Sequence, residues 1–355
     1  GDYNVGLGDS AGTAITSGAN NVAVGYQALL STTTAQDVTA IGFKSLQANT
    51  TGTGTAVGEA SLYTNTTGTD NTAIGRQALY SNTTAANNTA IGRSALFANT
   101  TGTHNSALGR NALDANTTGL RNTGLGYGSL SGNTTANDNT AVGYFALVAN
   151  TTGSANVSVG KDSLKANTTG ADNVAVGYVA LAANTTGIDN VALGAYALDA
   201  NTTASYNTAV GWSSLQANTT GSHNIAAGKE AMKTNTTGDG NTVVGSQALY
   251  YNTTGSNHSV LGRGALFTNT TGTQNTAVGS DALGNNTTGG NNTALGYQVL
   301  KLNTTASENT GVGHNTLSAN TTGAGNLGVG FQVLRGNTTA NYNTGVGYDA
   351  LVYNT

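Results

Sequence analysis

Residues 65–81 read NTTGTDNTAIGRQALYS, and residues 82–98 read NTTAANNTAIGRSALFA, which is the same seventeen-residue pattern with small changes. The pattern continues in residues 99–115, NTTGTHNSALGRNALDA, and fills the 355-residue chain with about 21 copies. Because a repeat this short can contact only its neighbours, successive copies must stack on one another. The sequence therefore predicts an extended, uniform surface and not a globular domain built around one pocket.

The composition excludes several classes of protein. Only 8% of the residues are charged and the net charge is −4, so no basic stripe is present to attract nucleic acid or an anionic membrane. The chain has no Pro, which together with the low charge fits poorly with a disordered linker. It also has no Cys, so it can form neither a disulfide nor a thiolate metal site. No apolar run is long enough to span a membrane.

A polar, repetitive chain without Cys is typical of an exposed surface fibre, so we expect an extracellular or cell-surface location. The sequence opens and closes within a repeat. We therefore expect residues 1–355 to form a single repetitive domain that belongs to a longer fibrous protein.

We number the repeat in columns, with the Asn of NTT as column 1. Column 11 is Gly in every unit, from Gly8 to Gly347, which requires either a positive φ or the close approach of another backbone. Column 15 is Leu from Leu29 to Leu351, with Met232 as the one substitute, and column 10 is Val, Ile or Leu except for Ala227. Columns 9 and 14 are small, and columns 12, 13, 16 and 17 vary.

These columns predict an all-β fold, because Gly, Asn and Thr are too frequent for helices and the apolar columns lack helical spacing. Columns 8–11 predict a short strand with Thr and Val on one face and Ala and Gly on the other. A second short strand around x-A-L-x and a turn at NTTGxx complete one coil of a parallel β-solenoid, with Leu and Val inside. At the usual strand spacing of about 4.8 Å, 21 coils give a length on the order of 100 Å.

One spacing is irregular, since Asn49 and Asn65 are 16 residues apart. Loops absorb deletions more easily than strands do, which supports a turn at columns 4–7.

The predicted core is thin, because two aliphatic side chains offset only part of the backbone entropy of a seventeen-residue coil. The Ala and Gly face of columns 9 and 11 is smooth and suits the packing of a second subunit. We therefore expect a homo-oligomer, with a trimer favoured and end-to-end fibres as a further option.

Two stretches carry a family resemblance, residues 139–147 (NTAVGYFAL) and residues 173–181 (NVAVGYVAL). They resemble the head repeats of YadA-type trimeric autotransporter adhesins and, more closely, the Asn-Thr-rich repeats of bacterial and phage tail-fibre-domain proteins. The resemblance covers essentially the whole chain. It implies a left-handed parallel β-roll with three chains side by side, an extracellular setting and an adhesive or fibre role. The adhesin unit is shorter, and this chain inserts the NTTG turn.

The NTT triplet is an acceptor for N-glycosylation, which would place one glycan on every coil. The alternative is a purely structural ladder of stacked Asn side chains, which column 7 supports because Asn71 and Asn122 recur there outside acceptor sequences. Column 3 is always Thr within these triplets, as glycosylation requires. The candidate glycosylation sites are Asn49, Asn65, Asn82, Asn99, Asn116, Asn133, Asn150, Asn167, Asn184, Asn201, Asn218, Asn235, Asn252, Asn269, Asn286, Asn303, Asn320 and Asn337.

Column 12 mixes aromatic and basic residues, and its rings could stack on sugars or bind a receptor. The other interpretation is a solvated rim that shelters the layer beneath. The aromatic members of this candidate binding stripe are Tyr26, Phe43, Tyr127, Tyr144, Tyr178, Trp212, Tyr297, Phe331 and Tyr348.

Catalytic and metal-binding patterns are missing from the sequence, so we expect a protein that is not an enzyme and uses no cofactor. The four histidines share no metal-ligand spacing, and no carboxylate recurs in every repeat as a calcium-binding repeat requires.

The repeat as a whole predicts a non-catalytic shaft or adhesive segment of an extracellular fibre. The alternatives are a receptor- or carbohydrate-binding segment that uses column 12, and an ice-binding solenoid that uses the Thr columns.

Overall fold

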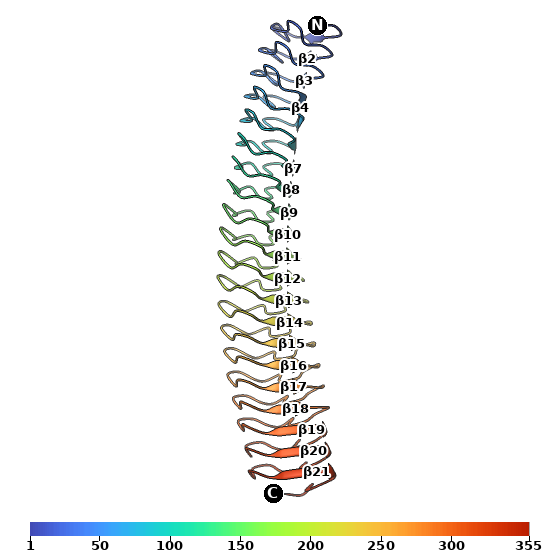
Figure 1. Ribbon diagram of the computed structural model, residues 1–355, viewed down its shortest axis with the longest axis vertical. Coiled ribbons are helices and arrows are strands. Elements are labelled where there is room, and N and C mark those ends of the chain that lie inside the picture. The colour runs from blue at the N-terminus through green and yellow to red at the C-terminus, as the bar shows by residue number, and fades with distance from the viewer. Residues whose placement is uncertain (355) are drawn as a thin grey trace. The chain divides into compact units, whose positions relative to one another are not determined.

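The computed structural model describes residues 1–354, which divide into two compact units, residues 1–173 and residues 174–354. Both units repeat one coil, and each coil contributes one short strand followed by turns. Residues 1–354 contain no helix. Figure 1 shows that, within each unit, the coils follow one another in chain order.

The strands of the first unit are β1 (Val5–Leu7), β2 (Val22–Val24), β3 (Thr39–Ile41), β4 (Gly54–Val57), β5 (Asn71–Ile74), β6 (Thr89–Ile91), β7 (Ser106–Leu108), β8 (Thr123–Leu125), β9 (Thr140–Val142) and β10 (Val157–Val159). The strands of the second unit are β11 (Val174–Val176), β12 (Val191–Leu193), β13 (Thr208–Val210), β14 (Ile225–Ala227), β15 (Thr242–Val244), β16 (Ser259–Leu261), β17 (Thr276–Val278), β18 (Thr293–Leu295), β19 (Thr310–His314), β20 (Leu327–Phe331) and β21 (Thr344–Tyr348).

Within each unit, every strand pairs in parallel with the strand of the next coil. Ala73 of β5 lies opposite Ala90 of β6, and Ala192 of β12 lies opposite Ala209 of β13, so the register is one repeat. The short repeat keeps this register because Gly54 of β4 pairs with Asn71 of β5, which leaves the missing residue in the turn. The predictions of parallel solenoid coils and of a turn at columns 4–7 are confirmed in each unit.

The strand alternates as predicted, but the prediction of which face lies inside was wrong. Column 9 is buried, with Ala73 and Ala209 at 0% exposure, whereas column 10 points outward, with Ile74 at 40% and Leu261 at 52%. Column 10 was expected in the core with Leu, and the small face of column 9 was expected outside. Column 9 faces the buried Leu of column 15 across a narrow interior, where it is Ala in most coils and Val at Val243 and Val260.

The predicted second strand at x-A-L-x is also wrong. Columns 12–17 form turns, and the Leu of column 15 has a left-handed backbone in every coil, as in Leu79 (φ 50°) and Leu249 (φ 51°). A left-handed conformation costs a residue with a side chain about 1–2 kcal/mol. Complete burial of the Leu side chain is worth about 1.5–3 kcal/mol and offsets this strain.

The Gly of column 11 meets both requirements that the sequence left open. Gly92 has φ 132°, and a Cβ atom there would lie 2.6 Å from the carbonyl oxygen of Gly109 in the next coil. Any side chain in this column would push neighbouring coils apart.

In the core, column 14 lies beside column 9 of the following coil. In most coils both are small, as in Ala282 and Ala294. In the last coils column 9 becomes Gly while column 14 becomes larger: a Cβ atom on Gly311 would meet Val299 Cγ1, and one on Gly328 would lie 2.6 Å from Thr316 Cγ2. Cores tolerate such swaps when the total volume is conserved.

Candidate functional surfaces

The Asn of column 1 lies inside the coil, at 0% exposure in all eighteen predicted glycosylation sites, from Asn49 to Asn337. Asn116 is representative: its Nδ2 donates to Asn99 Oδ1 of the preceding coil (2.9 Å) and to the carbonyl oxygen of Gly119 in its own coil (3.1 Å). The same pattern recurs in the second unit, where Asn218 Nδ2 donates to Asn201 Oδ1 (3.0 Å). This chain of amides is the Asn ladder that the sequence left as the alternative to glycosylation.

Column 7 forms a second ladder. The backbone N–H of Asn105 donates to Asn88 Oδ1 (2.9 Å), and Asn88 Nδ2 donates to the carbonyl oxygen of Gly102 (2.9 Å). That carbonyl also accepts from Asn99 Nδ2 (2.9 Å), so the two ladders meet at column 4. Among residues 1–354, no buried side-chain nitrogen or oxygen atom lacks a hydrogen-bond partner.

These contacts bear on the predicted glycans. A sugar on Nδ2 would replace one of the two donated hydrogens and enter space that neighbouring coils fill. The folded coil therefore favours the ladder, because each buried amide is already satisfied. N-glycosylation stays a prediction, and the intact mass of native material tests it.

The two Thr columns of NTT differ in exposure. Column 2 is half-buried, and its hydroxyl donates to the next coil, as Thr100 Oγ1 does to the carbonyl oxygen of Thr117 (3.2 Å). Column 3 is exposed in nearly every coil, as Thr101 is. NTT therefore presents one exposed Thr column and not the two that a flat Thr plane requires.

The outward strand face, defined here as the side chains of columns 8 and 10, combines a mostly Thr column 8 with a column 10 that is Val, Ile or Leu in every coil except at Ala227. Its column 10 members include Leu108 at 47% and Leu125 at 40% exposure, in neighbouring coils of the first unit. The second unit has a row of its own, in which Val176, Leu193 and Val210 are 37–39% exposed. Contiguous exposed apolar surface is typical of an interaction site.

Column 12 is exposed, as the aromatic stripe requires, but several of its rings cover one another. Tyr26 and Phe43 stack with centroids 5.3 Å apart, and Phe331 and Tyr348 stack at 4.9 Å. Tyr127 and Tyr144 form a third pair at 5.4 Å. Faces that are covered in this way cannot receive a sugar ring. These stacks strengthen the contact between coils, as the interpretation of a sheltering rim expects.

The remaining aromatic members of column 12 differ from this pattern. Tyr178 meets Tyr196 edge-on, whereas Tyr297 stacks on His314 of column 12, which in turn stacks on Phe331. Trp212 lies under two ammonium groups, with Lys229 Nζ 5.5 Å and Lys233 Nζ 5.3 Å from its ring.

Lys233 also holds a carboxylate beside Trp212. Its Nζ lies 2.9 Å from Glu230 Oε1, and Gln247 Nε2 donates to Glu230 Oε2 (3.0 Å). The hydrogen bond from Lys233, aided by that from Gln247, lowers the pKa of Glu230. The Glu230 carboxylate, Lys233 and Gln247 are therefore paired with one another within the chain.

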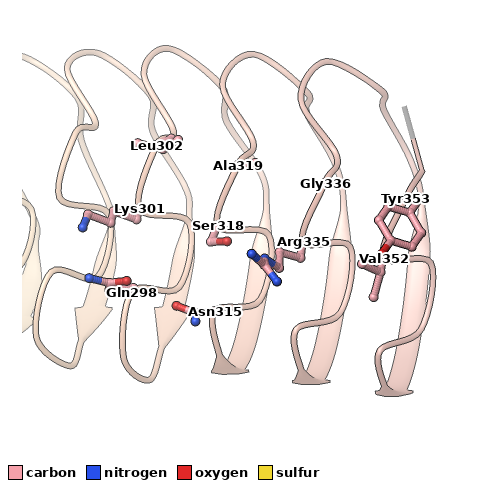
Figure 2. Close-up of a pocket in the computed structure, with 10 residues that line it drawn as sticks. All are labelled: Gln298, Lys301, Leu302, Asn315, Ser318, Ala319, Arg335, Gly336, Val352 and Tyr353. Atoms are coloured by element: carbon pink, nitrogen blue, oxygen red, sulfur yellow. The ribbon is translucent and has the colours of Figure 1, made fainter.

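A polar groove, here called the basic groove, runs along the coils of the second unit between column 13 and columns 16 and 17. It encloses about 640 Å³. Figure 2 shows Lys301, Ser318 and Arg335 in one row, with the amides of Gln298 and Asn315 in the row beside it. Its lining residues are Gln298, Lys301, Leu302, Asn315, Ser318, Ala319, Arg335, Gly336, Val352 and Tyr353.

A smaller hollow of about 240 Å³ adjoins the basic groove, because Lys301 lines both. Arg263 and Asp281 are its other charged members. Sequence reasoning missed this region, since columns 13, 16 and 17 look like variable surface. The available signal was the coincidence of small residues in columns 16 and 17 at Gly284, Ser318 and Gly336.

The described residues contain no group of three or more His, Cys, Asp or Glu side chains that could hold a metal ion. Residues 1–354 likewise offer no helix with the length and apolarity needed to cross a bilayer. Neither a family model nor a curated protein matches this sequence.

Proposed function

We propose that this chain is a shaft segment of an extracellular fibre, in which copies associate side by side through the outward strand face. The observation that supports the proposal is the row of aliphatic side chains at column 10, of which Leu7, Ile41, Ile74, Leu108 and Leu125 in the first unit are 39–67% exposed. A trimer of left-handed coils is the arrangement that the family resemblance favours, and this association replaces the smooth Ala face with the aliphatic face as the contact surface.

The energy of the outward strand face depends on its length. An aliphatic side chain that is about two-fifths exposed still has on the order of 1 kcal/mol to gain from burial. Association costs roughly 4–15 kcal/mol in lost freedom of motion, so one or two coils cannot hold two chains together. The ten strands of the first unit supply about the required amount.

The test is the oligomeric state of the chain in solution. We expect the native chain to form oligomers in analytical ultracentrifugation, and the triple variant Ile74→Lys, Leu108→Lys, Val142→Lys to be a monomer. The three lysines lie two coils apart and point outward, so the coil itself tolerates them. A native chain that stays monomeric at high micromolar concentration would contradict the proposal.

A matched control distinguishes the loss of the outward strand face from the effect of three added positive charges. The variant Asn87→Lys, His104→Lys, Ala155→Lys adds three lysines to column 6, where Arg121 already stands. These positions lie in the exposed turn away from the outward strand face. We expect this control to associate as the native chain does.

A further inference from the structure

We propose that the basic groove of the second unit binds an acidic polysaccharide that runs along the direction in which the coils stack. This is a binding function, separate from the structural role proposed above, and it does not depend on whether chains associate.

The charge of the basic groove selects an anion. All its charged lining residues are cationic, namely Lys301 and Arg335. Among residues 1–354, none of the ion pairs includes either of them. Arg335 Nη1 donates to Gln332 Oε1 (3.2 Å), which leaves its other donors available. Two cations without carboxylate partners in one groove are suited to charge-assisted hydrogen bonds with carboxylates.

The regular spacing of cations along the groove favours a polymeric ligand. Lys301 and Arg335 occupy column 16 two coils apart, a separation of about 10 Å at the usual strand spacing. The adjoining hollow adds Arg263 of column 12 together with the carboxylate of Asp281, so cations from columns 12 and 16 recur at about every second coil. An extended chain of pyranose sugars advances by a similar distance for each sugar residue as the stack does for each coil. Carboxylates on alternate sugars would then meet successive cations.

The amide side chains on the other wall of the groove favour a ligand that is rich in hydroxyl groups, such as a sugar. Gln298 and Asn315 occupy column 13 in neighbouring coils, and Figure 2 shows both amides beside the cationic row. Each amide offers both donors and an acceptor, which pair with sugar hydroxyls. A single-stranded nucleic acid would instead need a series of free aromatic faces on which successive bases could stack. The nearby rings of His314, Phe331 and Tyr348 cover one another, and Tyr353 adds one exposed ring to the groove.

The groove has depth because small residues form its floor. Column 16 holds Tyr63, Tyr80 and Tyr250 in other coils, whereas Ser318 stands there in the basic groove. The column accepts Tyr without disturbance, so Ser318→Tyr should fill the groove and leave the coil and its charge intact. This variant tests the groove itself, apart from the cations.

The experiment titrates the full chain with alginate, a carboxylated polysaccharide, by isothermal calorimetry at low salt without calcium. Neutral dextran and a single-stranded oligonucleotide serve as comparison ligands. The variants are Ser318→Tyr, the double variant Lys301→Gln, Arg335→Gln, and a control, Arg93→Gln, Arg110→Gln, which removes the same charge from column 12 of the first unit. Circular dichroism confirms that each variant is folded.

We expect alginate to bind the native chain and the control alike, and dextran and the oligonucleotide to bind far more weakly. The Lys301→Gln, Arg335→Gln variant should bind alginate about tenfold more weakly or worse, the loss expected for at least one charge-assisted hydrogen bond. The Ser318→Tyr variant should bind it more weakly because the ring occupies the space of the polysaccharide. The proposal is overturned if alginate does not bind, if Ser318→Tyr leaves its affinity unchanged, or if the oligonucleotide binds equally well.

Discussion

At column 7 a side chain must accept a hydrogen bond from one backbone N–H and donate one to a carbonyl of the next coil. Asn does both with one amide, and His258 does both with its two ring nitrogens. His258 Nε2 lies 2.7 Å from the carbonyl oxygen of Gly272, and Nδ1 lies 3.2 Å from the backbone nitrogen of Asn275. The geometry assigns the proton to Nε2, so Nδ1 must stay unprotonated to accept.

This position makes the stability of the second unit depend on pH. Burial lowers the pKa of His258 to about 4, from 6.5. Between these values the unfolded chain binds a proton that the folded chain does not, so stability falls as the pH drops from 6.5 to 4, by about 3 kcal/mol in all. Above pH 6.5 the group makes no pH-dependent contribution.

Replacing His258→Asn should remove this dependence, because Asn fills the same column in most coils. Urea denaturation at pH 7 and at pH 4.5 gives the free energy of unfolding of the native chain and of the variant. Titration of the carboxylates affects both proteins equally, so it cancels when the two pH dependences are subtracted. His223 lies in an exposed turn. The control variant His223→Asn should therefore lose the same stability between pH 7 and pH 4.5 as the native chain does. An equal loss of stability in the native chain and His258→Asn would refute the assignment.

At the scale of the element, one coil is held by matched pairs across a narrow interior. Val299 and Gly311 form such a pair, since a Cβ atom on Gly311 would meet Val299 Cγ1. The pair Ala282 and Ala294 fills the same place one coil earlier. In the last coils, a larger residue at column 14 therefore goes with Gly at column 9 of the following coil.

A double-mutant cycle tests this dependence. Gly311→Ala alone should destabilise the second unit by about 1–3 kcal/mol through overpacking. Val299→Ala alone should cost about 1–2 kcal/mol through the cavity it leaves. The double variant recreates the Ala–Ala pair of the preceding coil and should lose much less than the sum of the two, as thermal denaturation would reveal. Additive losses would show that the two residues do not share the space.

The coil also shows what its sequence could and could not reveal. Alternation in columns 8–10 predicted the strand, and the invariant Gly of column 11 predicted a close backbone approach. The inner face could not be read, because Ile74 is more apolar than Ala73 and the narrow width of the coil decides between them. Leu79 gave no sign of its left-handed backbone, since Leu rarely adopts it and only tertiary packing offsets the strain. The basic groove depends on which small residues become neighbours across coils.

At the scale of the whole molecule, each unit gains stability and contact surface one coil at a time. We expect association to depend steeply on coil number. Residues 65–81 and residues 82–98 are nearly interchangeable, so both can be deleted with the register of the remaining coils preserved. Deleting them together with residues 99–115 removes three outward aliphatic side chains.

The measurement is the dissociation constant of the oligomer against the number of deleted coils. If each coil contributes on the order of 1 kcal/mol, each deletion should weaken association about fivefold. Deletion of residues 99–115 alone, compared with residues 82–98 alone, controls for sequence differences between coils. A dissociation constant that is indifferent to coil number would place the contact at one local site and contradict association along the face.

The sixteen-residue repeat between Asn49 and Asn65 has a consequence for how the first unit finds its native state. Most coils are so similar that a partly folded chain could skip one, loop it out, and still satisfy nearly every ladder. The short repeat resists such slippage, because it has Gly54 at column 7, where the next coil has Asn71. The short repeat differs from all the others and so fixes the register of the coils around it. Restoring the seventeenth residue should make misaligned, slowly correcting species more common during refolding.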